Sequence, residues 1–200
     1  DKPLEVSVDF ADTTDKDGKP VKNACSKWIK LESDKFVIPP QSIKDLKFTA
    51  SVPKDAKGGF WTALVYSYAQ GQVKGPEEIT LNIRMNIEQA LRIYVEGTIE
   101  RKLSIGEFNA SFSKGELEIS GKVKNSGNSF QDVKPTYLVI DGSGKAVKSI
   151  RGAVFRTYPG DEKDFSGKNK IDLKNGVNKI IAVFDYENAE LLTTEKTFSI

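Results

Sequence analysis

The chain has 200 residues, of which 38% are hydrophobic, and its formal net charge is +2. This length fits two domains of about 100 residues each. Lysine, arginine, aspartate and glutamate are mixed along the chain, so it lacks the basic stripe that phosphate binding requires. The composition excludes a globally disordered chain and gives no reason to expect a nucleic-acid partner.

The residue types that are scarce restrict the chemistry. The chain contains no histidine and a single cysteine, Cys25. A Ser-His-Asp triad, a zinc site with histidine ligands and a disulfide within the chain are therefore excluded. No apolar run approaches the roughly 18 residues of a membrane span. We predict a non-enzymatic protein with no catalytic residues, no cofactor and no metal site.

Hydrophobic and polar residues alternate along most of the chain, which is the pattern of half-buried strands. In chain order, the predicted strands are residues 4–10, 46–52, 60–68, 79–95, 117–123 (broken at Gly121), 137–140, 177–186 and 191–200. Turn-forming segments rich in Gly, Pro, Asp and Asn separate them. The sequence predicts an all-β fold of two tandem immunoglobulin-like β-sandwich domains.

Residues 12–20, DTTDKDGKP, cluster acidic residues before a glycine. An EF-hand loop would need a ligand at Thr13 and a glutamate at Ala24, so the spacing does not match a calcium site. A polar turn is the better interpretation. Trp28 and Trp61 both lie beside apolar neighbours at strand starts, and we interpret them as packing residues.

Residues 79–95 show the longest alternation in the chain. All odd positions but Gln89 are apolar: Ile79, Leu81, Ile83, Met85, Ile87, Leu91, Ile93 and Val95. This run is much longer than a usual strand of about 5–6 residues. Either one strand bends between two sheets, or two strands keep phase across a kink near Glu88–Ala90. The even positions are mostly polar, which indicates that one face is wet.

Arg84 and Arg92 lie on this polar face. An arginine fork could bind a carboxylate. Alternatively, the two charges keep an exposed face soluble and protect a sheet edge from unwanted pairing.

An internal repeat supports two domains. Residues 2–21 and 134–147 share an order: Lys-Pro, an alternating strand, an Asp-rich turn with Gly-Lys, then a valine. Two strands' length of chain precedes the second copy and has no equivalent before the first. We expect domains at residues 1–97 and 98–200, with the first lacking N-terminal strands that total about 30 residues.

Two segments together carry a family resemblance. Residues 28–68, WIKLESDKFVIPPQSIKDLKFTASVPKDAKGGFWTALVYSY, and residues 78–97, EITLNIRMNIEQALRIYVEG, resemble bacterial tandem immunoglobulin-like proteins related to periplasmic pilus-assembly chaperones. The resemblance covers residues 25–97. It implies an exported protein of the periplasm or bacterial cell surface.

The resemblance also implies a way of binding. Pilus chaperones lend alternate apolar residues of their long strand to an incomplete sandwich in a pilus subunit, which is a form of β-strand addition. The matching partner-binding positions here are Ile79, Leu81, Ile83, Met85 and Ile87, with Arg84 and Arg92 beside them.

One part of the family pattern does not match. Pilus chaperones hold the subunit's C-terminal carboxylate with a basic pair, one residue on the first strand and a lysine on the long strand. The lysine's position falls near Ala90, and the first strand is not among these residues. A cell-surface adhesion module that binds wall polymer or a surface protein, and accessory domains of a larger exported protein, therefore stay open. The client and the oligomeric state stay open as well.

Overall fold

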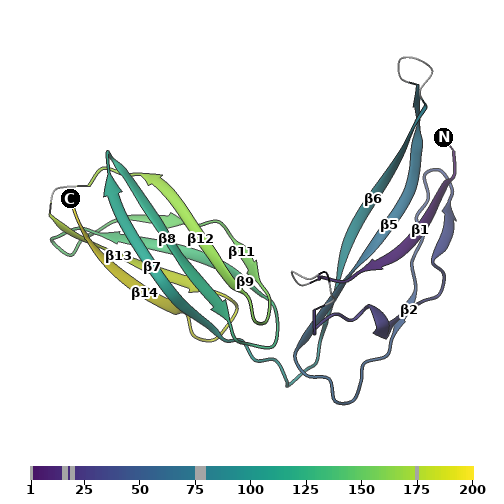
Figure 1. Ribbon diagram of the computed structural model, residues 1–200, viewed down its shortest axis with the longest axis horizontal. Coiled ribbons are helices and arrows are strands. Elements are labelled where there is room, and N and C mark those ends of the chain that lie inside the picture. The colour runs from purple at the N-terminus through teal and green to yellow at the C-terminus, as the bar shows by residue number, and fades with distance from the viewer. Residues whose placement is uncertain (1, 15–17, 19–20, 75–79, 174–175) are drawn as a thin grey trace. The chain divides into compact units, whose positions relative to one another are not determined.

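The computed structural model describes residues 2–14, 18, 21–74, 80–173 and 176–200. It divides into two compact units, Asp1–Gly97 (unit 1) and Thr98–Ile200 (unit 2), both built from antiparallel strands (Figure 1). The predicted all-β class is confirmed: the described residues hold one short 3-10 helix, η1 (Ser26–Trp28), and no α-helix. No helix in this part of the chain is long and apolar enough to cross a membrane.

Unit 2 is a two-layer sandwich. One sheet has the order β10-β9-β13-β14, with β11 also paired to β9, and the facing sheet has the order β12-β8-β7. The strands are β7 (Leu103–Ser113), β8 (Glu116–Asn125), β9 (Gln131–Ile140), β10 (Ala146–Arg151), β11 (Phe155–Thr157), β12 (Glu162–Lys170), β13 (Val177–Asp185) and β14 (Leu192–Ser199). Alternate residues of both sheets meet in one core of fifteen buried side chains, among them Leu117, Val139 and Phe184. Two-sided burial of this kind is what holds an immunoglobulin-like domain together.

Gly121 lies inside β8, so the predicted break of that strand is wrong. The pairing of β8 with β12 runs without interruption through Gly121. The irregularity lies on the other neighbour, β7, where the register shifts between Ile105 and Phe108. A Cβ atom at Gly121 would lie 2.4 Å from the Glu107 carbonyl oxygen and 2.5 Å from the Phe165 ring. The glycine therefore permits close packing rather than a turn.

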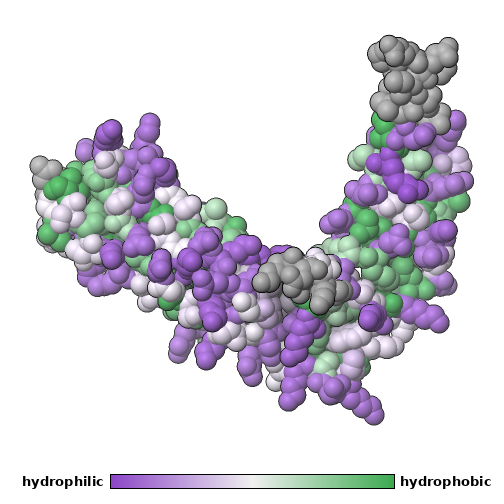
Figure 2. All heavy atoms as spheres, viewed as in Figure 1, coloured by the Kyte–Doolittle hydropathy of each residue, from purple (hydrophilic) through white to green (hydrophobic). Residues whose placement is uncertain are grey.

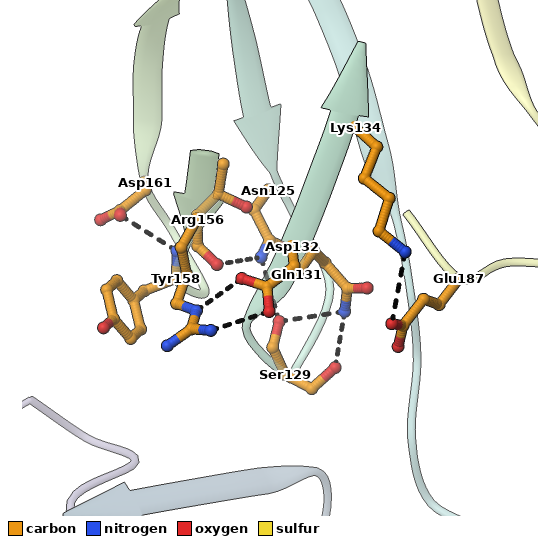
Figure 3. Close-up of polar contacts among 10 residues, drawn as sticks. Asn125, Ser129, Gln131, Asp132, Lys134, Arg156, Tyr158, Asp161 and Glu187 are labelled. Atoms are coloured by element: carbon orange, nitrogen blue, oxygen red, sulfur yellow. Dashed lines mark hydrogen bonds and ion pairs between the residues drawn. The ribbon is translucent and has the colours of Figure 1, made fainter. Parts of the chain in front are cut away.

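A buried asparagine fastens the end of unit 2 where β8 ends and β9 begins (Figure 3). The Asn125 amide nitrogen donates to the carbonyl oxygens of Ser129, at 3.0 Å, and Thr157, at 3.4 Å. Its side-chain oxygen accepts from the Gly127 backbone N–H at 3.0 Å. Asn125 thus ties the β8–β9 turn to β11, with all of its side chain out of solvent.

An ion pair closes the same corner on its outer side. Arg156 on β11 donates to both carboxylate oxygens of Asp132 on β9, at 2.6 and 2.7 Å, and its guanidinium lies 4.9 Å from the centre of the Phe130 ring. The two-pronged geometry matches an arginine fork to a carboxylate. The hydrogen bond to Asp132 raises the pKa of Arg156, so the pair stays charged.

Asn125→Ala is expected to lower the free energy of unfolding of unit 2 by about 2–4 kcal/mol, because it leaves one N–H and two C=O groups without their buried partner. Urea unfolding followed by circular dichroism measures the change. The matched control is Asn109→Ala, which removes an exposed asparagine from β7. Equal effects of the two substitutions would show that Asn125 does not fasten the corner.

Unit 1 has a similar large sheet but a much smaller facing sheet. The strands are β1 (Leu4–Ala11), β2 (Ile29–Leu31), β3 (Lys35–Ile38), β4 (Phe48–Ala50), β5 (Gly59–Lys74) and β6 (Thr80–Tyr94). One sheet has the order β3-β1-β5-β6, and β2 pairs only with β4. Three buried side chains, Val6, Val8 and Leu64, form the centre of the core. Unit 1 therefore buries far less apolar surface than unit 2.

The packing predicted for Trp61 is confirmed. Trp61 is buried on β5, and its indole N–H donates to the Thr13 hydroxyl at 3.0 Å. Trp28 packs on Phe60 with ring centres 4.3 Å apart. Cys25 is fully buried beside them, and burial, with a smaller contribution from Asp12, raises the pKa of its thiol to about 11. A thiol of this kind is a packing group rather than a nucleophile.

Of two other predictions for unit 1, one is wrong in part and the other concerns residues that lie partly outside the described chain. Of the strand predicted at residues 46–52, only β4 forms, and the side chains of Phe48 and Val52 are exposed rather than half-buried. Their alternation marks an apolar face, yet no described strand covers it. The acidic segment at residues 12–20 lies partly outside the described residues.

Candidate strand-addition edge on β6

The long alternating run forms a single strand, β6, at the margin of the large sheet of unit 1. It pairs with β5 from Thr80 to Tyr94 without a kink near Glu88–Ala90. The irregularity lies on β5, where the register shifts between Ala69 and Gly71. The kink and the change of sheet considered from the sequence are therefore wrong. The bulge on β5 inserts one extra residue opposite β6 and increases the local twist of this long strand pair (Figure 1).

The outer edge of β6 is open to pairing. β6 ends the order β3-β1-β5-β6, so its other edge has no strand beside it in the part of the chain that the structure describes. An edge strand carries a row of backbone N–H and C=O groups that can pair with another chain. The length of β6 makes this row long.

Three of the predicted binding side chains are exposed together on one face of β6. Ile83, Met85 and Ile87 are 39%, 38% and 51% exposed. Leu81 lies in β6 opposite Val73, but its side chain is outside what the structure describes, and so is the whole of Ile79. A single exposed apolar residue needs no explanation, but a row at alternate positions of a free edge fits strand addition.

The row ends at Gln89, the one polar residue on this face. The Tyr66 hydroxyl donates to the Gln89 side-chain oxygen at 2.9 Å, so the polar group is satisfied by the neighbouring strand. Beyond it, Leu91 and Ile93 are half-buried. Sequence reasoning identified Gln89 as an exception but could not find Tyr66 as its partner, because the two residues lie on different strands.

The two arginines are not brought together. Arg84 pairs in register with Ala69, and Arg92 with Trp61. Eight residues of strand separate them by about 26 Å, so they cannot form one carboxylate fork. Arg84 lines a shallow pocket together with Glu5 and Lys35. Ala90, where the family's lysine would lie, is opposite Ala63. The structure therefore places no basic pair at this point of β6.

Beside the edge, the same face of the sheet continues into an apolar groove. Its volume is about 490 Å³. Figure 2 shows hydrophobic surface on unit 1 where Figure 1 draws β1 and β5. The lining side chains come from all four strands of the sheet and from β4, among them Leu4, Phe36, Phe48, Tyr68 and Ile87. The groove was not predicted from the sequence. Its signal was the pair of tyrosines at alternate positions of β5.

Comparison with known proteins shows which solved structures this architecture resembles. No protein-family model matches the chain, and no curated protein sequence matches it. Among solved structures, a chain from a chaperone–tip adhesin complex of CFA/I fimbriae biogenesis is 16% identical, with a TM-score of 0.51. The class 5 fimbriae chaperone CfaA (16% identical, TM-score 0.49) and the YadV chaperone (13%, 0.47) are also similar. Each match covers 98% of this chain and 86% of the other.

The likeness defines a class of fold. The chain has the two-domain, all-β immunoglobulin-like architecture of fimbrial chaperones, as the resemblance in its sequence predicted. At 16% identity, this agreement concerns the fold, and the function must be argued from the edge and the face of β6.

Proposed function

We propose that this is an exported, non-enzymatic, chaperone-like protein that binds a segment of a secreted or pilus subunit by β-strand addition at the free edge of β6. The observation that carries the proposal is the row of Ile83, Met85 and Ile87, exposed at alternate positions of an edge strand. The resemblance to pilus chaperones in sequence and in fold supports it. Arg84 is proposed as a further contact of the bound segment.

In strand addition, the backbone and the side chains of one strand contribute differently to binding. Backbone hydrogen bonds along the edge supply affinity for any extended segment, and side chains at alternate positions select it by filling pockets. Burying an isoleucine or methionine side chain contributes about 1.5–3 kcal/mol. A partner with three successive apolar pockets would therefore gain most from Ile83, Met85 and Ile87.

Site-specific photo-crosslinking tests this proposal in the native host. A benzophenone amino acid placed at Ile87 is expected to crosslink to a secreted subunit, and mass spectrometry of the product should place the crosslink in a pocket of an incomplete β-sandwich. The matched control is the same probe at Val177 of unit 2, which is exposed to a similar degree at 58%. Cell fractionation of the crosslinked product reports its location.

Either of two results would overturn the proposal. One is an equal yield from both positions, which would indicate random encounters. The other is a partner captured only from positions away from β6, which would favour a surface module that binds through another face.

A further inference from the structure

The face of β6 opposite the apolar row carries two exposed charges of opposite sign. Arg84 and Glu88 lie four residues apart on this face, which is about 13 Å along the strand. Asn86 lies midway between them, and its side-chain oxygen accepts a hydrogen bond from the Ser67 hydroxyl on β5 at 2.8 Å. The neutral residue of the three is therefore bound within its own sheet.

The two charged residues have no such partner on β5. Arg84 lies opposite Ala69, and Glu88 lies opposite Val65. Neither takes part in an ion pair in the part of the chain that the structure describes, although Glu5 lines the same shallow pocket as Arg84. The sheet of unit 1 thus leaves both charges available to a strand on the other side of β6.

That other side is the free edge, because β6 ends the order of its sheet. A strand added there places one of its residues directly opposite each residue of β6, with Cβ atoms about 4.5–5.5 Å apart. Opposite charges in such cross-strand pairs stabilise the pairing, and like charges destabilise it. The edge can therefore select a segment by apolar side chains on one face and by charge on the other.

Building on the strand addition proposed above, we infer that Arg84 and Glu88 determine which segment is bound. The segment carries an acidic residue opposite Arg84 and a basic residue opposite Glu88. Apolar residues opposite Met85 and Ile87 lie between them on the other face and fix the register. The recognised stretch therefore has five residues, opposite residues 84–88 of β6, with a charge of opposite sign at each end and apolar residues at its second and fourth positions.

Two synthetic peptides of about ten residues test this charge selection on the 200-residue chain. They share their apolar positions and differ only in the order of one lysine and one glutamate, so their compositions and net charges are equal. One peptide is expected to bind at least about 5-fold more tightly, because two attractive cross-strand pairs replace two repulsive ones. An NMR titration of the isotope-labelled protein measures both affinities and locates binding through the backbone amides of β6. A preference for lysine before glutamate indicates antiparallel addition, and the reverse preference indicates parallel addition.

Exchanging the two charges of the protein should invert the preference between the peptides. The variant Arg84→Glu with Glu88→Arg keeps the net charge and the apolar row, and both substituted side chains are exposed. The matched control is Lys179→Glu with Glu195→Lys, which exchanges an exposed ion pair of unit 2. The control should keep the preference of the wild type, because its charges lie far from β6 in the chain and in another unit.

The wild type alone gives a second reading that does not depend on a variant. In 1 M salt the preference should fall below about twofold, because the Debye length shrinks to about 3 Å and exposed charges are screened. Equal affinities at low salt, or a preference that the exchanged charges leave unchanged, would overturn the charge selection while strand addition at β6 stands. If neither peptide shifts the β6 amides, both proposals are wrong.

Discussion

Replacing Ile83 and Met85 with aspartate in one variant is expected to weaken capture of the partner at least about 100-fold. Each substitution removes about 1.5–3 kcal/mol of apolar burial and would bring a carboxylate into an apolar pocket, which adds a desolvation cost. Two such losses exceed the roughly 2.8 kcal/mol that correspond to a 100-fold change in affinity. The dissociation rate, measured with the partner identified by crosslinking, should carry most of the change.

The same variant should leave the fold of unit 1 nearly intact. Ile83 and Met85 are more than a third exposed in the free protein and lie at the margin of the sheet. Circular dichroism and the fluorescence of Trp28 and Trp61, which report the sheet and its packing, are therefore expected to match those of the wild type.

A matched variant distinguishes the effect of losing side-chain insertion from the effect of adding negative charge. Asn82→Asp with Asn86→Asp adds the same two negative charges to the opposite face of β6, where the Asn86 side-chain oxygen accepts from the Ser67 hydroxyl at 2.8 Å. Capture by this control should change by less than about threefold, because no apolar burial is lost. Equal losses in both variants would show that charge, and not side-chain insertion, decides binding.

Local patterns predicted much of this fold because a strand's alternation is a property of consecutive residues. The strands at residues 4–10, 177–186 and 191–200 follow from alternation and their flanking turns, and β1, β13 and β14 confirm them. The alternation of residues 79–95 likewise predicted which side chains share a face of β6.

Pairing between distant segments could not be predicted in the same way. Whether β6 is an edge strand depends on what lies beside it in space, as does the exposure of Phe48 on β4. The separation of Arg84 and Arg92 could have been predicted from the sequence, because their spacing along one strand already sets the distance between them. The strand break predicted at Gly121 was wrong. A glycine inside a strand can mark either a break or a close approach of neighbouring atoms, and the sequence alone does not distinguish the two.

Gly121→Ala is expected to produce a large loss of stability in unit 2, about 3 kcal/mol or more. The added Cβ would lie 2.4 Å from a backbone atom, the Glu107 carbonyl oxygen, and 2.5 Å from the Phe165 ring. A flexible side chain could turn away, but the carbonyl belongs to β7 at the point where its register shifts, and Phe165 is itself packed in the core. Relief therefore requires β7 or β12 to shift relative to β8 within their sheet.

The neighbouring strand offers a control for this substitution. A Cβ at Gly167 on β12 would find its nearest atom, the Asn169 side-chain nitrogen, at an ordinary 3.7 Å. Gly167→Ala is therefore expected to be neutral or to stabilise by up to about 1 kcal/mol, because alanine restricts the unfolded chain. Urea unfolding followed by circular dichroism compares the two variants. If Gly121→Ala were as stable as Gly167→Ala, the close packing of β8 against β7 and Phe165 would not hold in solution, and the core of unit 2 would be looser than fifteen buried side chains imply.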